Sequence, residues 1–307
     1  MKTLAIPFLA CEPEQYDPAW ADEGFGTEAS LFDRADLLDP DSWATVRRTV
    51  RSVAGARRHP SFTFHFPVND CDYVADPVVR DRLWEAVDMV ADNELDGLVL
   101  HSNRVRTTEQ WRELDLRAER DRFAEFVQEL GRRVAGERFW IGLENMPLMG
   151  NDATDFDPLL VFPQDVAGLC SDNIGLTWDF CHYSYSVHIA GLLAQGLVPD
   201  SSDYVPVPDG VGHLDFTTID DLIVHHHFSA FLGQAVRGGE QCIEGVAPWE
   251  STLPERVYAD AFAAIARSAR ARTVTLEIRE EDYRRRTKVF EVARWCRDIL
   301  EREGARA

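Results

Sequence analysis

The chain has 307 residues, of which 45% are hydrophobic and 28% are charged, and its formal net charge is −21. These proportions fit a globular protein with a sizeable core. The strongly acidic balance argues against a nucleic-acid partner, because an acidic surface repels phosphates. Only Lys2 and Lys288 are lysines among the 32 basic residues, so adaptation to a salty cytoplasm, where ions screen charge, is an alternative explanation of the acidity.

The cysteines and the apolar segments indicate the compartment. Six cysteines are spread along the chain without a Cys-x-x-Cys pair, which predicts reduced thiols in a cytoplasmic protein. No apolar run approaches the ~20 residues of a membrane span, so we expect no membrane partner. Residues 1–11 faintly resemble a lipoprotein signal, but their apolar run is very short, and we expect a buried first strand there instead.

The apolar patterns predict alternating strands and helices along the chain. Strands are expected at 3–8, 28–33, 61–66, 95–101, 138–144, 173–179, 221–228 and 273–278. Helices are expected at 41–56, 76–92, 117–134, 163–169, 185–195, 253–269 and 281–301. The segments 11–27 and 196–212 are rich in Pro, Asp and Gly and are expected to be loops.

This alternation favours parallel strands joined by helical crossovers. Eight strands over some 280 residues are typical of a (β/α)8 TIM barrel, and we expect one such α/β domain over residues 1–307. A doubly wound open sheet is the alternative. No Gly-x-Gly-x-x-Gly turn follows the first strand, which disfavours that alternative.

The sixth predicted strand ends in residues suited to metal binding. Ile174, Leu176 and Trp178 alternate with small residues and then with Asp179, so the bulky face is expected to pack against helices. Three residues past Asp179, on the expected loop, comes His182. A carboxylate at a strand tip with an imidazole just beyond it suits a hard or borderline cation.

The same design recurs on the other strands. When their bulky residues face outward, the inward series end in potential ligands: His65, His101, Glu144, Asp179, His225 with His227, and Glu277. Barrel enzymes place their chemistry at this C-terminal rim. Burying these groups together without a cation would be costly, which predicts a metal centre. The alternatives are hydrogen-bonded core histidines and a salt bridge between Glu277 and Arg279.

An ordered series of short motifs resembles the xylose-isomerase-like barrel superfamily, which holds sugar and sugar-phosphate isomerases and epimerases, and endonuclease-IV-type AP endonucleases. The motifs are Leu-Glu-Asn-Met-Pro at 143–147, Leu-Thr-Trp-Asp-Phe-Cys-His at 176–182, the His run at 225–227 and Thr-Leu-Glu-Ile at 275–278. The resemblance implies a divalent metal, Mn, Zn, Mg or Co, with one site and a possible second. Its implied ligands are Glu144, Asp179, a seventh-strand His, preferably His227, and Glu277.

Two further features resemble the endonuclease branch and two depart from it. His65-Phe-Pro-Val-Asn and Leu-His101-Ser match segments whose histidines hold an additional zinc with the first Glu in that branch. Three ligands on consecutive strands can also close around one ion, so we predict a second cation site at His65, His101 and Glu144. The Asp-x-His pair of a third zinc site is missing, and Ala230 occupies the position of a common family Asp.

The leading hypothesis is a metal-dependent isomerase or epimerase acting on a sugar, sugar phosphate or related polyhydroxy carbonyl compound. Glu144 and Glu277 would move the proton, and His182 would bind a substrate oxygen or a second metal. Arg279 and the run 284–286 would reach a phosphate or form a solvated helix face. A two-metal hydrolase and a non-catalytic metabolite-binding barrel are the alternatives. The expected partner is a small molecule, and an oligomer is possible.

Overall fold

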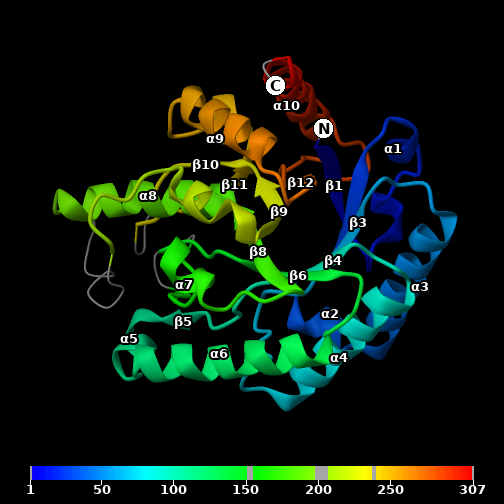
Figure 1. Cartoon of the computed structure of the whole chain (residues 1–307), viewed down its shortest axis with the longest axis horizontal. Coiled ribbons are helices and arrows are strands. Elements are labelled where there is room, and N and C mark those ends of the chain that lie inside the picture. Colours follow the sequence, from blue (N-terminus) through cyan, green and yellow to red (C-terminus); the bar gives the residue numbers. More distant parts are fainter. Residues whose placement is uncertain (1, 151–154, 198–206, 237–239, 306–307) are drawn as a thin grey trace.

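A computed structural model describes residues 2–150, 155–197, 207–236 and 240–305. Eight parallel strands close into a barrel in the order β1-β12-β9-β8-β6-β4-β3-β2 (Figure 1). In chain order they are β1 (Thr3–Leu9), β2 (Gly26–Ser30), β3 (Phe62–His65), β4 (Gly97–Leu100), β6 (Trp140–Glu144), β8 (Ile174–Asp179), β9 (Ile223–Phe228) and β12 (Thr273–Leu276). The expected (β/α)8 TIM barrel is confirmed.

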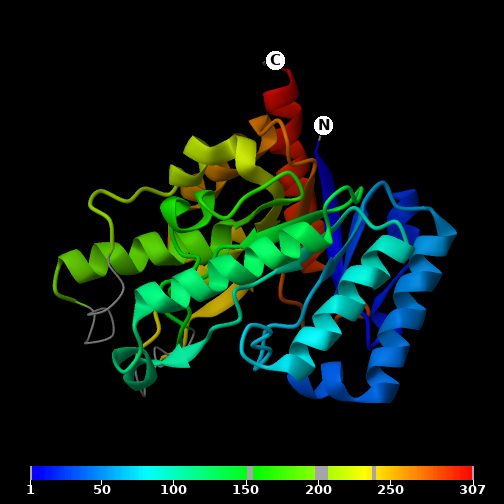
Figure 2. The same cartoon turned by 60° about the horizontal axis from the view of Figure 1, so that its bottom comes forward.

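Helices form the outer layer around these strands (Figure 2). The longer ones are α3 (Pro40–Ala56), α4 (Pro77–Asp92), α6 (Leu116–Arg133), α8 (Phe180–Ala194), α9 (Glu255–Arg267) and α10 (Lys288–Gly304). Shorter helices are α1 (Ala19–Asp22), α2 (Arg34–Leu38), α5 (Thr108–Arg112), α7 (Pro163–Ala167), η1 (Pro13–Gln15), η2 (Asp215–Leu222) and η3 (Pro248–Glu250). None of the described helices is long and apolar enough to cross a membrane.

Two small antiparallel sheets lie outside the barrel and were not expected from the sequence. One pairs β5 (Arg106–Thr107) with β7 (Asp155–Phe156), and the other pairs β10 (Ala230–Leu232) with β11 (Ile243–Val246). The second sheet follows β9 in the chain, and its strand β11 places Glu244 at the cavity on the barrel rim. Of the expected loop 196–212, the part at 198–206 lies outside the described residues.

Capping side chains set two helix starts that the apolar pattern misplaced. The helix expected at 185–195 begins at Phe180, because the Asp179 carboxylate accepts a 2.6 Å hydrogen bond from the backbone N–H of His182. His182 therefore lies in the first turn of α8 and not in a loop. The last helix begins at Lys288 because the buried Glu280 carboxylate accepts from the backbone N–H groups of 287–289.

The second strand also begins earlier than expected. It starts at Gly26, and the segment 11–27, expected to be loop, contains η1 and α1 before it. A Cβ at Gly26 would lie 3.1 Å from the backbone oxygen of Ser61, so glycine allows β2 to approach β3 closely. With this start, Glu28 is an inward-facing residue of the barrel, where it is fully buried.

The barrel interior is closed at its N-terminal end by Trp140. A Cβ on Gly97 would lie 2.4 Å from the Trp140 ring, so glycine at this position of β4 leaves the space that the indole fills. The indole stacks on the His225 ring with 5.1 Å between centroids. The interior is consequently packed at this end, and the cavity that His65, Glu144 and Glu277 line lies at the other end of the strands.

Candidate functional site

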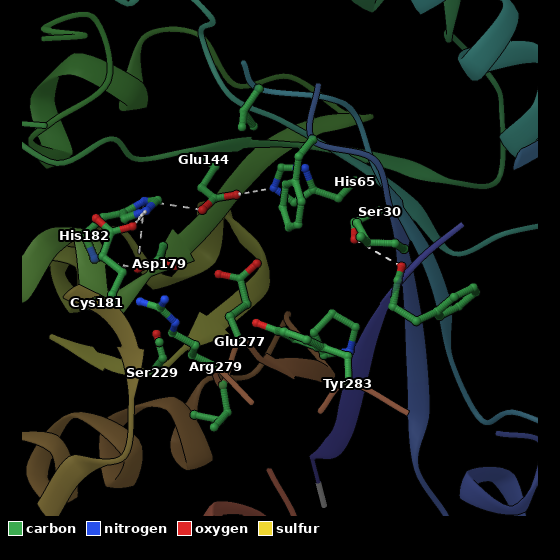
Figure 3. A pocket seen from close by; sticks show the side chains of 18 of the residues that line it. Ser30, His65, Glu144, Asp179, Cys181, His182, Ser229, Glu277, Arg279 and Tyr283 are labelled. Carbon is green, nitrogen blue, oxygen red and sulfur yellow. Dashed lines mark hydrogen bonds and ion pairs between the residues drawn. The ribbon is translucent and has the colours of Figure 1, made fainter. Parts of the chain in front are cut away.

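A cavity of about 290 Å³ lies at the C-terminal ends of the barrel strands. Its lining includes His101. It also includes His65, Glu144, Asp179, His182 and Glu277, which are labelled in Figure 3. In the close-up view, the carboxylates of Glu144 and Glu277 point toward the same space. These six of the residues expected from the sequence therefore share one open site.

Glu144 lies at the centre of the buried cluster. Its Oε2 atom is 3.1 Å from His65 Nε2, 3.1 Å from His101 Nε2 and 3.2 Å from His227 Nδ1. The Glu144 side chain is 1% exposed. One carboxylate oxygen thus faces three imidazole nitrogens that come from three different barrel strands or their ends.

A second group of ligand-type atoms shares Glu144 with the first. His227 Nδ1 lies 3.4 Å from Glu277 Oε1 and 4.0 Å from Asp179 Oδ2. One ligand atom each from Glu144, Asp179, His227 and Glu277 lies within 4.8 Å of the others, and the same holds for His65, His101 and Glu144. Both ligand sets expected from the sequence are therefore assembled, although their metal binding remains a prediction.

Unpaired buried atoms test whether a cation fits these residues. Glu144 Oε1, His227 Nδ1 and His101 Nε2 are buried without a hydrogen-bond partner among the described residues. Such atoms are costly to bury, and here they converge on each other. Carboxylate oxygens with imidazole nitrogens are the donor set that divalent zinc, manganese and related ions accept. The residues present therefore fit a divalent cation.

The electrostatics of the cluster also favour a bound cation. Burial by itself would raise the pKa of Glu144, but the rings of His227 and His101 hold it well below its usual range. Burial lowers the pKa of His227, yet the carboxylates around it, with Glu144 first, raise it well above its usual value. Burial also raises the pKa of Asp179 to about 7. The metal-free cluster must hold protons to balance its carboxylates, and a cation would replace them.

His182 occupies one wall of the cavity. Its Nδ1 lies 2.9 Å from the backbone oxygen of Asn145 and 3.4 Å from Glu144 Oε1. Its Nε2 lies 3.8 Å from Glu244 Oε2. A hydrogen bond from Nδ1 to the Asn145 carbonyl leaves Nε2 as the atom that faces a ligand. This geometry suits the predicted contact of His182 with a substrate oxygen.

Asn145 connects the strand tips that carry Glu144 and Asp179. Its side-chain amide donates to the backbone oxygen of Asp179 at 2.9 Å and accepts from the Asp179 N–H at 2.8 Å. All of these atoms are buried. The amide therefore fixes the end of β8 against β6 and with it the direction of the Asp179 carboxylate.

His225 lies apart from the rim group, deeper in the barrel. Its Nε2 is 3.2 Å from Glu28 Oε2 and 3.0 Å from Thr275 Oγ1. A ligand atom of His225 does lie within 4.8 Å of ligand atoms of Glu28 and His227. The sequence prediction that His225 is a metal ligand stays a prediction; its ligand-type neighbours are Glu28 and His227 and not Asp179 or Glu277.

Sequence reasoning missed Glu28 and Glu244. The signal for Glu28 was available, because it alternates with Thr27 and Ala29 once the strand is started at Gly26. Glu244 carries no such signal, since it reaches the site on β11 of the added antiparallel sheet. Each of the two lies beside a different histidine: Glu28 contacts His227, and Glu244 faces His182.

The arginines after β12 divide into two groups. Arg279 and Arg286 line the cavity. Arg284 instead forms a 2.7 Å ion pair with Glu14, and Arg285 is highly exposed. Of the two expectations for this segment, the solvated surface therefore describes Arg284 and Arg285, whereas Arg279 and Arg286 lie at the cavity.

The fold and the site together describe a closed parallel barrel with a cluster of His, Glu and Asp at its C-terminal rim. No family model matches this chain, and no curated protein matches it in sequence. Solved structures do match over nearly the whole chain. They include an L-ribulose 3-epimerase, at 14% identity and a TM-score of 0.60, with 100% of this chain and 97% of that chain covered.

Two more solved structures have comparable similarity. One is an AP endonuclease of family 2 from Brucella melitensis, at 15% identity and a TM-score of 0.59, covering 97% of this chain and 99% of that chain. The other is a Thermus thermophilus protein soaked with zinc chloride, at 17% identity and a TM-score of 0.55, covering 97% and 98%. At these identities the similarity shows the barrel fold alone, and the activity must be argued from the site.

Proposed function

We propose that this protein is a divalent-metal-dependent isomerase or epimerase that acts on a sugar, a sugar phosphate or a related polyhydroxy carbonyl compound. The observation that carries the proposal is the convergence of Glu144, Asp179, His227 and Glu277 within 4.8 Å at the floor of an open cavity. The volume of about 290 Å³ suits one small metabolite. The six free thiols support a cytoplasmic location.

The residues of the site can be given separate tasks. Glu144, Asp179, His227 and Glu277 would hold a divalent cation, which would supply Lewis-acid polarisation of the substrate carbonyl. Glu277, with a side chain 31% exposed, is open to the cavity and can take the proton from the carbon beside that carbonyl. Glu144 also lines the cavity and can return a proton, since its Oε1 has no hydrogen-bond partner among the described residues.

Polar groups on the cavity wall can orient the substrate. His182 lines the cavity, and because its Nδ1 donates to Asn145, its Nε2 can accept a hydrogen bond from a substrate hydroxyl group. Arg279 lines the same cavity, is exposed, and can contact a hydroxyl group or the phosphate of a sugar phosphate. These contacts would hold the reacting carbon near the two carboxylates, which is how positioning lowers a barrier of this kind.

The test is exchange of substrate hydrogen with solvent deuterium. The metal-loaded protein is incubated in D₂O with a panel of ketoses, aldoses and their phosphates, and the label is read by mass spectrometry and NMR. We expect label at the carbon beside the carbonyl, and loss of exchange in Glu277→Gln. Glu281→Gln, which changes an exposed carboxylate of the same segment, is the matched control and should exchange normally. No exchange across the whole panel would contradict the proposal.

A two-metal hydrolase is the second candidate, and His65 and His101 favour it. Both rings lie 3.1 Å from Glu144 Oε2, so a second cation fits beside the first, as in enzymes that cleave phosphate esters with paired metals. Hydrolysis of a small phosphodiester by the metal-loaded protein, lost in His65→Ala, would favour this candidate. If the protein shows neither hydrogen exchange nor hydrolysis, the remaining candidate is the non-catalytic metabolite-binding barrel.

A further inference from the structure

Glu28 is the centre of a buried polar layer below the rim cluster, which it forms with Thr63, Thr275 and His225. Its carboxylate is fully buried inside the barrel. Its Oε2 atom accepts hydrogen bonds from Thr63 Oγ1 at 2.7 Å and from Thr275 Oγ1 at 3.3 Å, and lies 3.2 Å from His225 Nε2. Oε2 is therefore fully occupied by neighbours that are remote from the cavity.

The other oxygen of Glu28 lies beside His227. Glu28 Oε1 lies 3.1 Å from His227 Nε2, and neither atom has an aligned hydrogen bond among the described residues. On the opposite edge of the same ring, His227 Nδ1 faces Glu144 at 3.2 Å and Glu277 at 3.4 Å. The imidazole of His227 thus stands between a buried carboxylate below and the candidate metal ligands above.

A neutral imidazole carries one proton, and its position decides which nitrogen can bind a cation. A proton on Nε2 can be donated to Glu28 and leaves the lone pair of Nδ1 directed at Glu144, Asp179 and Glu277. A proton on Nδ1 would leave Nε2 against a carboxylate, where two acceptors repel each other. Histidine ligands of metals commonly have their second nitrogen held by a carboxylate in this way.

We propose that Glu28 is a positioning residue, which fixes His227 as the tautomer protonated at Nε2 and so presents Nδ1 to the divalent cation of the rim. The inference rests on the metal centre of the proposed function. The inference also bears on the cluster of Glu28, His225 and His227, whose ligand atoms lie within 4.8 Å of one another. This cluster could either support His227 as a ligand of the rim cation or hold a cation itself. With its proton on Nε2, His227 cannot also bind a cation on the side of Glu28.

Glu28→Gln is the informative substitution because it keeps the shape and reverses one hydrogen bond. The hydroxyl groups of Thr63 and Thr275 donate at the position of Oε2, so the amide oxygen should occupy that position. The NH₂ group then faces His227 Nε2 and requires it to accept. The proton moves to Nδ1 and blocks the lone pair that the cation needs.

The first experiment measures metal affinity by titrating the metal-free full-length protein with Zn²⁺ and Mn²⁺ in a calorimeter. We expect Glu28→Gln to weaken binding about 10- to 100-fold, the usual effect of losing such a supporting group. Thr63→Val is the matched control, because it removes a bond to Oε2 and leaves Oε1 in place; its affinity should change much less. Equal affinities for Glu28→Gln and the wild type would overturn the inference.

The second experiment leaves Glu28 and its neighbours Thr63, Thr275 and His225 unchanged. Long-range ¹H–¹⁵N correlation spectra of the Zn²⁺-loaded wild type report which ring nitrogen of His227 is protonated, with a His227→Gln variant assigning the signals. We expect a proton on Nε2 and zinc on Nδ1, and the reverse would overturn the inference. If the wild type takes up no metal at all, the metal centre of the proposed function fails as well. Metal uptake with an unchanged Glu28→Gln affinity removes only the role of Glu28.

Discussion

Replacing Asn145 by alanine tests how the end of β8 is held in register with the metal-ligand cluster. The wild-type amide makes two hydrogen bonds with the backbone of Asp179, at 2.9 and 2.8 Å. In Asn145→Ala, the N–H and the C=O of Asp179 lose these partners inside the protein. The Asp179 carboxylate also caps α8 through the N–H of His182, so the disturbance reaches both residues.

The structure sets the size of the effect. Each hydrogen bond contributes ~1 kcal/mol net, and leaving its buried backbone partner unsatisfied adds to that loss. We therefore expect Asn145→Ala to lower the free energy of unfolding by roughly 2–4 kcal/mol. The affinity for a divalent cation should fall about tenfold or more, because outer hydrogen bonds that orient ligands have effects of this order.

Asn173→Ala is the matched control. The Asn173 amide donates to the backbone oxygens of Glu137 and Phe139, at 3.0 and 2.9 Å, at the opposite end of the same pair of strands. Urea unfolding of the metal-free proteins measures stability, and calorimetry measures cation affinity. Asn173→Ala should lose some stability but bind the cation as the wild type does. If Asn145→Ala also retained wild-type affinity, the reasoning about Asp179 would be refuted.

Two further predictions concern the same rim. Burial raises the pKa of Asp179 to about 7, so protons compete with the cation below that pH. The calorimetric affinity for the cation should therefore fall as the pH drops from 8 to 6, by up to about tenfold per pH unit for each displaced proton. An affinity that stays constant over this range would contradict the role of Asp179 as a ligand. Gly245 has φ +82° and a Cβ there would lie 3.0 Å from the Glu277 backbone oxygen, so Gly245→Ala should cost more unfolding free energy than the ~1 kcal/mol expected of strain alone. Gly24→Ala, at φ +78° with open space around it, measures that strain by itself, and equal losses in the two variants would refute the predicted clash.

The fold and most of the rim could be predicted from sequence because their signals are local. Strands β4, β6 and β8 carry bulky outward residues that alternate with small inward ones, so the inward partner at each tip follows directly. The ends of parallel barrel strands meet at one rim. Glu144, Asp179 and Glu277 were therefore placed together without knowledge of any contact between them.

The parts that could not be predicted depend on contacts between distant residues. The start of α10 is set by Glu280 accepting from backbone groups further along the chain, and periodicity does not report such caps. Glu244 reaches His182 through the two-stranded sheet of β10 and β11. The interior neighbour of His225 is Glu28 on β2, and a contact between strands so far apart in the chain leaves no local signal.

The most direct test of the whole account is the metal content of the purified chain. Metal-free protein is loaded with Mn²⁺ or Zn²⁺, dialysed, and measured by elemental analysis beside the Asp179→Asn/Glu277→Gln double variant. The account predicts stoichiometric metal in the wild type and a large loss in the double variant, with a separate partial loss in His65→Ala/His101→Ala if the second site is filled. A wild type that holds no more metal than the double variant would contradict the central claim that this rim is a cation centre.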